Sequence, residues 1–233
     1  MKCLALREDV CRINQEIVRA GLVVLTFGNA SGADRRAGVM AIKPSGVDYA
    51  ALTPDDIVVL SLADGRVLAG TKRPSSDTAT HLHLYQHFPN IGGIVHTHSV
   101  QATAWAQAHR EIPCFGTTHA DHCHGPVPVT RPLTTAEIRG DYELNTGKVI
   151  VERFSRSKLN PDHVPAVLVA GHAPFVWGPT PAKALENAIA LEAMAQMATL
   201  TLAIQPRAKP IPRVLLDKHF LRKHGPRAYY GQA

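Results

Sequence analysis

The sequence predicts a single α/β domain in which helices pack on a central sheet of mixed or antiparallel strands. Apolar, β-favouring runs alternate along the chain with segments in which apolar residues recur at helical spacing. The pair Asp64-Gly65 between two of these runs is a hairpin signal, which argues against a purely parallel, doubly wound sheet. The chain has 233 residues, of which 45% are hydrophobic and 19% charged, enough for one sizeable core.

The N-terminal part of the chain is predicted to form one helix followed by strands. Val10, Ile13 and Ile17 have helical spacing and Gly21 provides a C-terminal stop, which predicts a helix over residues 8–20. The segment that follows is rich in apolar and β-branched residues bounded by turn residues. We expect strands at 22–27 and 39–46, and the hairpin at 56–70.

The central part of the chain is predicted to combine one strand with two helices. Residues 75–88 are expected to form a loop leading into a short helix that Pro89 stops. We expect a strand at 92–99 and a helix at 100–109. The stretch 111–132 is rich in proline, glycine, threonine and histidine, which favours loops and short strands that line a site.

The C-terminal part is predicted to contain two short strands around a turn, at 165–178, and one long helix. Thr180 followed by Pro181 is typical of an N-cap and the first helical position, and this helix is expected to run to about Ile204. Its polar positions form a narrow stripe, which predicts that most of the helix is buried; they are Glu192, Gln196 and Thr199.

Composition argues against several classes of partner. The formal charge is +6, but the basic residues are scattered, only 6% of residues are aromatic, and no nucleic-acid module is recognisable. A small anionic substrate accounts for this modest positive balance. No apolar run approaches the roughly 20 residues of a membrane helix, and the N-terminus does not fit a signal peptide. The four cysteines lack CxxC spacing, which suits reduced thiols and a cytoplasmic protein. Together, these observations predict neither a membrane partner nor a nucleic-acid partner.

Two histidines in the segment GGIVHTHS are candidate metal ligands. On a strand, His96 and His98 would project from the same face, as metal ligands, as an acid/base pair, or as the polar face of a half-buried strand. A third imidazole, His172, lies at a turn after an apolar strand, and Asp77 lies at a predicted helix start. Together the four side chains form a candidate Asp/His/His/His set for a divalent metal such as zinc.

Three short turns upstream of these histidines are candidate anion-binding sites. Backbone N–H groups at a helix N-terminus, serine hydroxyls and a nearby ammonium together bind phosphate well. Each turn alone favours an ordinary capped turn, but their repetition suggests a phosphorylated substrate. The residues are Asn29 in GNAS, Lys43, Ser45 and Gly46 in KPSGVD, and Ser75 and Ser76 in KRPSSD.

Acid/base candidates occur in one loop and in the C-terminal tail. Asp121 lies among His119, His122 and His124, and a cluster of titratable groups in a loop indicates either an acid/base site or a polar surface loop. The tail PRAYYGQA contains Tyr230. Either this tail is a fraying chain end, or it delivers the Tyr230 phenol into the site of a neighbouring subunit.

These motifs follow one another in an order that resembles the L-ribulose-5-phosphate 4-epimerases of the class II, metal-dependent aldolase/adducin-like superfamily. The resemblance runs from about residue 8 to the C-terminus. It implies a three-layer α/β/α single domain over 1–233, assembled as a fourfold homotetramer with active sites at subunit interfaces, to which the segment 215–233 contributes. The matching motifs are TFGNAS, IKPSGVDY, GTKRPSSDTATH, GGIVHTHS, GTTHAD, LLDKHFLRKHG and AYYGQ.

The resemblance also implies roles for individual residues. One divalent metal per subunit would bind the Asp/His/His/His set, with Zn²⁺ expected and Mn²⁺ or Co²⁺ as alternatives. Asp121 and Tyr230 would be the acid/base pair, with Tyr230 from the adjacent subunit. The implied metal ligands are Asp77, His96, His98 and His172, and the implied substrate-binding residues are Asn29, Lys43, Ser45, Gly46, Ser75, Ser76, Thr117, His219 and Arg222.

The implied reaction interconverts L-ribulose 5-phosphate and D-xylulose 5-phosphate. Carbon C4 carries no acidic proton, so the family breaks and re-forms the C3–C4 bond, while a Lewis acid stabilises the enediolate. Related aldolases carry a glutamate base where this chain has Asp77, which favours epimerase over ketose-phosphate aldolase. The sequence HCHGP after Asp121 departs from the aromatic residues expected there. A non-catalytic adducin-like interaction module is a further alternative, against which the complete ligand set argues.

Overall fold

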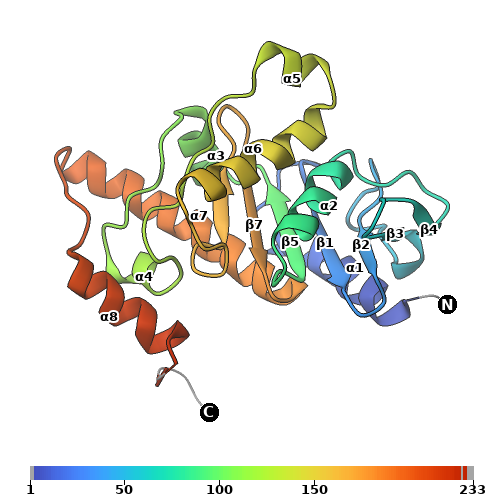
Figure 1. Ribbon diagram of the computed structural model, residues 1–233, viewed down its shortest axis with the longest axis horizontal. Helices are drawn as coiled ribbons and strands as arrows, with labels where there is room; N and C mark the ends of the chain where they lie inside the picture. Colours follow the sequence, from blue (N-terminus) through green and yellow to red (C-terminus); the bar gives the residue numbers. More distant parts are fainter. Residues whose placement is uncertain (1–2, 227, 230–233) are drawn as a thin grey trace.

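The computed structural model describes residues 3–226 and 228–229, and its centre is one seven-stranded antiparallel sheet (Figure 1). The strand order is β4-β3-β2-β1-β5-β7-β6. The first four strands of the chain, β1 to β4, form one half of the sheet in sequential order, and β5, β7 and β6 form the other half. This confirms the α/β class and the antiparallel sheet. The strands are β1 (Gly28–Asp34), β2 (Val39–Ile42), β3 (Val58–Ser61), β4 (Val67–Ala69), β5 (Gly93–Thr97), β6 (Ala166–Leu168) and β7 (Pro174–Gly178).

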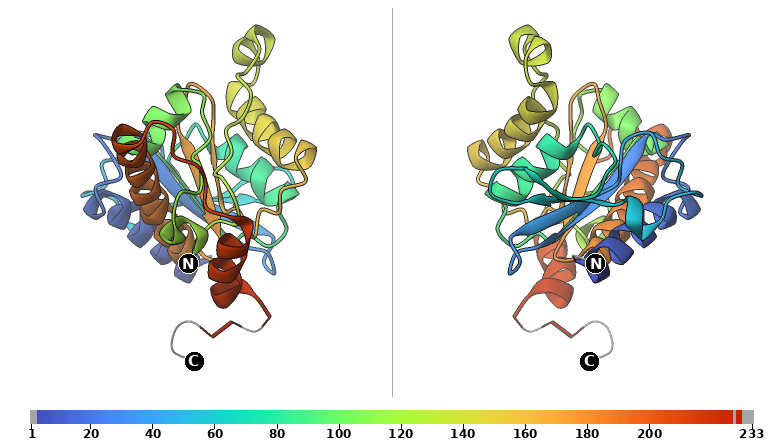
Figure 2. Two further views of the ribbon diagram at one scale, coloured as in Figure 1. Left: turned by 90° about the vertical axis from the view of Figure 1, so that its left-hand side faces the viewer. Right: turned by 90° about the vertical axis from the view of Figure 1, so that its right-hand side faces the viewer.

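Helices cover both faces of the sheet, which gives the three layers that Figure 2 shows edge-on. On one face α1, α3 and α7 enclose a core with the apolar side chains of β1, β5 and β7. On the other face α2 and α6 pack together over a second core. The helices are α1 (Leu4–Arg19), the 3-10 helix η1 (Pro54–Asp56), α2 (Thr78–His87), α3 (Val100–Gln107), α4 (Thr117–Ala120), α5 (Thr135–Arg139), α6 (Tyr142–Arg156), α7 (Pro181–Ile204) and α8 (Arg213–His224).

Two features lie outside the layers and bear on the site. The short helix α5 projects from one side of the molecule, on the segment that leads into α6 (Figure 1). At the other end α8 contacts α4, away from the centre of the sheet. The loops at 111–132 also contain α4, and the segment 133–164 forms α5 and α6, for which the sequence analysis made no prediction.

The strand expected at 22–27 is wrong, and the strand begins at Gly28 instead. Leu25 has φ 53°, a left-handed conformation that turns the chain before β1 starts. The small residues of β1 are central in the sheet, since Ser31 pairs with Ile42 on one side and Ile94 on the other. A Cβ on Gly32 would lie 2.9 Å from both Leu6 Cδ1 and Pro181 Cγ, so the glycine allows α1 and α7 to pack closely on β1.

The long helix α7 follows its predicted N-terminal signal, because the Thr180 side chain accepts a hydrogen bond from the backbone N–H of Lys183. The expected polar stripe does not face solvent alone. Glu192 accepts hydrogen bonds from the backbone N–H groups of Gln101 and Ala102 at the start of α3, and Thr199 accepts one from Trp105.

The expectation that most of α7 is buried is therefore wrong. One side packs on β5 and β7, while large apolar residues lie exposed on the other, with 54% exposure at Leu200 and 85% at Ile204. By length and composition alone, α7 is long and apolar enough to cross a membrane, so the expectation that the chain contains no apolar run of this length is also wrong. Of the 18 most apolar consecutive residues of α7, 33% are buried in the structure. In the structure, α7 packs along one side on the sheet as part of its outer helical layer.

Candidate metal centre and sugar-phosphate site

A cavity of about 440 Å³ opens where β1, β5, the N-terminus of α2 and the start of α6 meet. The sheet register brings its walls together, because Asn29 pairs with His96 across β1 and β5, and His96 pairs with Phe175 across β5 and β7. The lining residues are Thr26, Phe27, Gly28, Asn29, Lys43, Pro44, Ser45, Gly46, Ser75, Ser76, Asp77, His96, His98, Tyr142, Glu143 and His172.

Three imidazoles form the centre of this cavity. One ring nitrogen from each of His96, His98 and His172 lies within 4.8 Å of the others. His96 is buried, and its Nδ1 donates to the carbonyl of Pro174 at 2.9 Å, which leaves Nε2 with its lone pair available. This arrangement fits a divalent metal bound by nitrogen ligands.

The electrostatics of the imidazoles agree with a ligand role. Burial, together with the neighbouring His96 and His98, lowers the pKa of His172 to about 4. Burial and His96 also lower the pKa of His98. Neutral imidazoles are the form that binds metal, so these two side chains are ready as ligands at neutral pH.

Asp77 lies beside the three imidazoles, outside the group whose ligand atoms lie within 4.8 Å. Its Oδ2 accepts a hydrogen bond from Asn29 at 2.7 Å and lies 4.0 Å from Nε2 of His96. Burial opposes its ionisation, but His96, His81 and the Asn29 amide outweigh that effect and lower the pKa of Asp77. The side chain is thus an anion facing the cluster, and its role as a ligand stays a prediction.

The two serine-containing turns lie in the same cavity as the imidazoles, as the sequence suggested. Ser45 N–H donates to Arg73 O at 2.9 Å and Ser75 N–H to Lys43 O at 3.0 Å, which ties the turns side by side. Gly46 has φ 69°, a left-handed conformation that a glycine adopts without strain. The two turns and the residues just before α2 therefore lie together on one wall of the cavity.

Lys43 lines the cavity, but its ammonium group is engaged in holding the turn. Only 3% exposed, it donates to Pro44 O at 3.3 Å and Val47 O at 2.5 Å and lies 4.6 Å from the centre of the Tyr49 ring. Tyr49 in turn donates to Gly28 O at 2.5 Å. The Lys43 ammonium therefore holds the turn at residues 43–48, and its direct contact with phosphate stays a prediction.

Asp121 belongs to a second, separate group of charged residues, at the contact between α4 and α8. Its carboxylate accepts hydrogen bonds from Arg222 at 2.8 Å and from His219 at 3.0 Å. Burial opposes ionisation of Asp121, but the Arg222 and His219 hydrogen bonds and the Lys223 charge lower its pKa overall.

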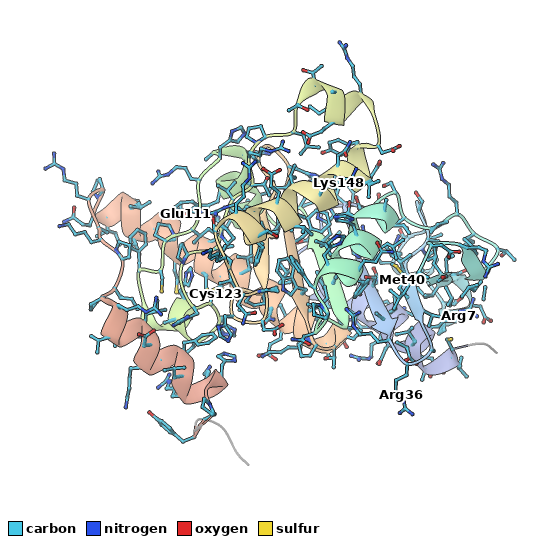
Figure 3. The ribbon with its side chains drawn as sticks, in the orientation of Figure 1. Arg7, Arg36, Met40, Glu111, Cys123 and Lys148 are labelled. Atoms are coloured by element: carbon cyan, nitrogen blue, oxygen red, sulfur yellow. The ribbon has the colours of Figure 1, made fainter. Side chains whose placement is uncertain are left out.

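Among the described residues, Thr117, Asp121, His219 and Arg222 all lie outside the lining of the imidazole cavity. Figure 3 shows Cys123 on one side of β5 and β7 and Met40 of β2 on the other side. Cys123 follows Asp121 by two residues. The expected catalytic Tyr230 falls outside the described residues.

Tyr142 and Glu143, in the first turn of α6, are cavity residues that the sequence analysis missed. Tyr142 Oη lies 3.2 Å from Nδ1 of His172, and Thr80 donates to the backbone carbonyl of Glu143. Burial and the charge of Asp77 raise the pKa of Tyr142, so the phenol keeps its proton. The two residues carry no motif, and only the packing of α6 on α2 brings them to the cavity.

The fold and the imidazole centre together define a protein of the class II aldolase type. The family described as class II aldolase and adducin N-terminal domain matches residues 8–199, and the chain belongs to that family. The L-ribulose-5-phosphate 4-epimerase UlaF of Salmonella paratyphi B is 51% identical over 227 residues, covering 97% of this chain and 98% of the relative. The same enzyme of Salmonella typhi matches equally.

Solved structures also share the fold. An L-fuculose 1-phosphate aldolase superposes with a TM-score of 0.77 at 26% sequence identity, covering 92% of this chain and 94% of the other. The L-fuculose 1-phosphate aldolase of Glaciozyma antarctica PI12 gives a TM-score of 0.75 at 17% identity, over 97% of this chain and 84% of the other. At that identity the second likeness concerns the fold alone.

Proposed function

We propose that this chain is an L-ribulose-5-phosphate 4-epimerase, which interconverts L-ribulose 5-phosphate and D-xylulose 5-phosphate. The observation that carries this proposal is the joint occurrence, in one cavity, of the three-imidazole cluster and the two serine turns. A volume of about 440 Å³ suits a small phosphorylated sugar. The curated relatives, 51% identical over almost the whole length, bear the same enzyme name.

The phosphate of the substrate would lie on the wall made by the serine turns. Ser45 and Gly46 present the first turn, and Ser75 and Ser76 present the second at the N-terminus of α2. The helix N-terminus and the serine hydroxyls are suited to an anion. Asn29 holds Asp77 through its amide nitrogen, and its own Oδ1 is a buried acceptor with no partner among the described residues.

A divalent metal would be held by His96, His98 and His172, with Asp77 proposed as the fourth ligand. We expect Zn²⁺, with Mn²⁺ or Co²⁺ as alternatives. When bound, such an ion supplies Lewis-acid stabilisation of negative charge on the sugar oxygens.

The residues of this chain would hold the fragments and move one proton. Epimerisation at C4 proceeds by cleavage of the C3–C4 bond into the dihydroxyacetone enediolate and glycolaldehyde phosphate. The serine turns would retain glycolaldehyde phosphate by its phosphate group while its aldehyde group rotates. Formation of the C3–C4 bond on the other face of the aldehyde then inverts C4. We propose Asp121 and Tyr230 as the groups that take up and return the proton of the C4 hydroxyl on opposite faces.

We also propose that the active site is shared between subunits of a homotetramer. Asp121, His219 and Arg222 lie together but outside the imidazole cavity of their own chain, so they would act at a neighbour's cavity. The segment 215–233 would contribute the tail. Beside the cavity, Leu25 is 77% exposed and Phe27 51% exposed, an apolar rim that a second copy would cover.

The alternative is a class II ketose-phosphate aldolase of the L-fuculose-phosphate type, whose fold this chain shares. Asp77 is the feature that favours the epimerase, because its short carboxylate lies beside the imidazoles and bonds to Asn29. The four unpaired cysteines accord with a cytoplasmic enzyme.

The deciding experiment is incubation of the zinc-loaded protein with L-ribulose 5-phosphate, followed by separation of the products. The proposal expects D-xylulose 5-phosphate to accumulate until an equilibrium mixture is reached. Net accumulation of glycolaldehyde phosphate with dihydroxyacetone would establish the aldolase instead. Unchanged substrate in the presence of Zn²⁺, Mn²⁺ or Co²⁺ would favour a non-catalytic interaction module.

A further inference from the structure

Tyr142 is the first residue of α6 and faces the metal cluster from the helical layer. Its hydroxyl oxygen lies 3.2 Å from Nδ1 of His172, and the two rings lie 6.1 Å apart at an interplanar angle of 29°. Tyr142 is half-buried and belongs to the same chain as the imidazoles.

His172 depends on such a partner more than His96 does. His96 is fixed on β5 by its hydrogen bond to Pro174 O and by stacking on Phe175 at 4.1 Å. His172 lies on the turn between β6 and β7, directly after Gly171, which has φ 72°. Among the described residues, the hydroxyl of Tyr142 is the hydrogen-bond partner of the His172 ring.

We propose that Tyr142 is a positioning residue, whose hydroxyl accepts the Nδ1–H of His172 and so directs Nε2 toward the metal. The inference rests on the proposed metal centre. A ligating histidine donates its second ring N–H to an outer partner, which fixes both the tautomer and the ring orientation. The opposite arrangement, with Tyr142 donating to Nδ1, would place the proton on Nε2 and prevent that nitrogen from binding metal.

The same arrangement keeps the phenolic proton of Tyr142 out of the bond to His172, and the Thr146 hydroxyl is the other side-chain group bonded to the phenol. A tyrosine hydroxyl has one proton and accepts through its oxygen lone pairs, and His172 engages only the oxygen. Because Tyr142 lines the cavity, its proton is available to a hydroxyl of the bound sugar. Tyr142 thereby links the orientation of a metal ligand to the presence of substrate.

The test is the substitution Tyr142→Phe, which removes only the hydroxyl. Zinc affinity is measured by competition with a chromophoric chelator, in the absence of substrate. We expect the affinity to fall roughly 10- to 100-fold, the usual effect of losing an outer-shell partner. The absorption bands of the Co²⁺-loaded protein should change as well, because the ligand field at the metal depends on how His172 is oriented.

The matched control is Tyr85→Phe. Tyr85 is buried and its hydroxyl bonds to Ser31 Oγ at 2.8 Å, but Tyr85 lies outside the cavity lining. This variant should lose folding stability while retaining the zinc affinity and the Co²⁺ spectrum of the unmodified protein. Equal losses of zinc affinity in both variants would point to general loosening of the fold and overturn the proposal.

The remaining outcomes separate this inference from the proposed function. If the unmodified protein binds zinc and epimerises L-ribulose 5-phosphate, but Tyr142→Phe binds zinc within twofold of it, the positioning role alone is wrong. If the unmodified protein binds no divalent metal, the metal centre itself fails, and the role of Tyr142 fails with it. At saturating zinc, a residual loss of kcat/KM in Tyr142→Phe supports the hydrogen bond to substrate, and full recovery contradicts that part.

Discussion

At the scale of single residues, His96 is the metal-ligand candidate whose surroundings are fixed on most sides. Its ring donates from Nδ1 to Pro174 O, stacks on Phe175 and lies within 5.2 Å of the His98 ring centre. These contacts leave Nε2 as the atom available to a metal. A residue held in this way provides metal affinity without further ordering cost.

We predict that His96→Asn loses bound zinc. The shorter amide would not reach the position of Nε2, so only His98, His172 and the proposed ligand Asp77 would remain. Elemental analysis after purification with zinc should show well below one metal per chain. The control is His87→Asn, an exposed position on α2, which should retain stoichiometric zinc. Full zinc occupancy in His96→Asn would contradict the proposed ligand set.

The half-buried His172 and the fully buried His81 also predict how the metal-free protein responds to acid. Burial, reinforced by neighbouring imidazoles, lowers the pKa of His172 to about 4, and burial lowers that of His81 to about 3. In the unfolded chain both would titrate near the ordinary value of about 6.5. The unfolded state therefore binds more protons below that pH, and the free energy of unfolding falls as pH falls.

The loss should begin near pH 6.5, above the range in which carboxylates titrate, and continue to about pH 4. Each histidine contributes at most about 1.4 kcal/mol per pH unit. Urea unfolding of the metal-free protein between pH 7 and pH 5 measures the slope, and His172→Asn should reduce it. Stability that stays constant over this interval would show that these imidazoles are accessible to protons in the folded state.

At the scale of elements, the approach of α7 to β5 fixes the strand that bears His96. A Cβ on Gly93 would lie 2.4 Å from Cα of Pro181, the first residue of α7, so only glycine permits this contact. The element that presents the imidazole is thus held by a backbone-to-backbone contact, and the helix N-terminus cannot shift without moving the strand.

We predict that Gly93→Ala destabilises the protein by about 3 kcal/mol or more, because the added methyl meets backbone and not a flexible side chain. Denaturant unfolding measures the change. Gly116→Ala is the matched control, since a Cβ there has open space and the backbone is extended, with φ −153°. Similar small effects in both variants would mean that α7 adjusts to the new methyl without cost.

The same scale explains which elements could be predicted. The start of α7 could be predicted from Thr180-Pro181, and the β3–β4 hairpin from Asp64-Gly65. Both signals depend on capping and turn preferences of neighbouring residues, which are local. The strand β1 lacks β-favouring residues, and its identity comes from pairing on both sides with β2 and β5. Likewise the histidine and serine motifs could be recognised, whereas Tyr142 reaches the site only through the packing of α6.

At the scale of the whole molecule, the residues proposed for catalysis are divided between two places. The imidazoles and serine turns surround the central cavity, whereas Asp121 lies with His219 and Arg222 at the contact of α4 and α8. Arg222 and His219 hold the Asp121 carboxylate in its own chain. In the proposed tetramer, the cavity of one chain and the Asp121 group of its neighbour would together form one active site.

This division predicts complementation between two inactive variants. Asp121→Asn should lower kcat by on the order of 10² to 10⁴ while retaining zinc, since it removes only the proton-transfer group. His96→Asn should be inactive through loss of zinc. In mixed oligomers, an Asp121→Asn chain supplies an intact metal cavity and a neighbouring His96→Asn chain supplies an intact Asp121.

With random assembly of equal amounts in a closed ring, about one quarter of the sites combine both intact halves, since each half is intact with a chance of about one half. Coexpression of the two variants with different affinity tags, followed by isolation of doubly tagged oligomers, should therefore restore activity well above either variant alone. Mixing the separately purified, stable oligomers provides the control and should restore little. If doubly tagged oligomers stay as inactive as the single variants, Asp121 acts within its own chain or not at all, and its assignment to a neighbour's cavity is wrong.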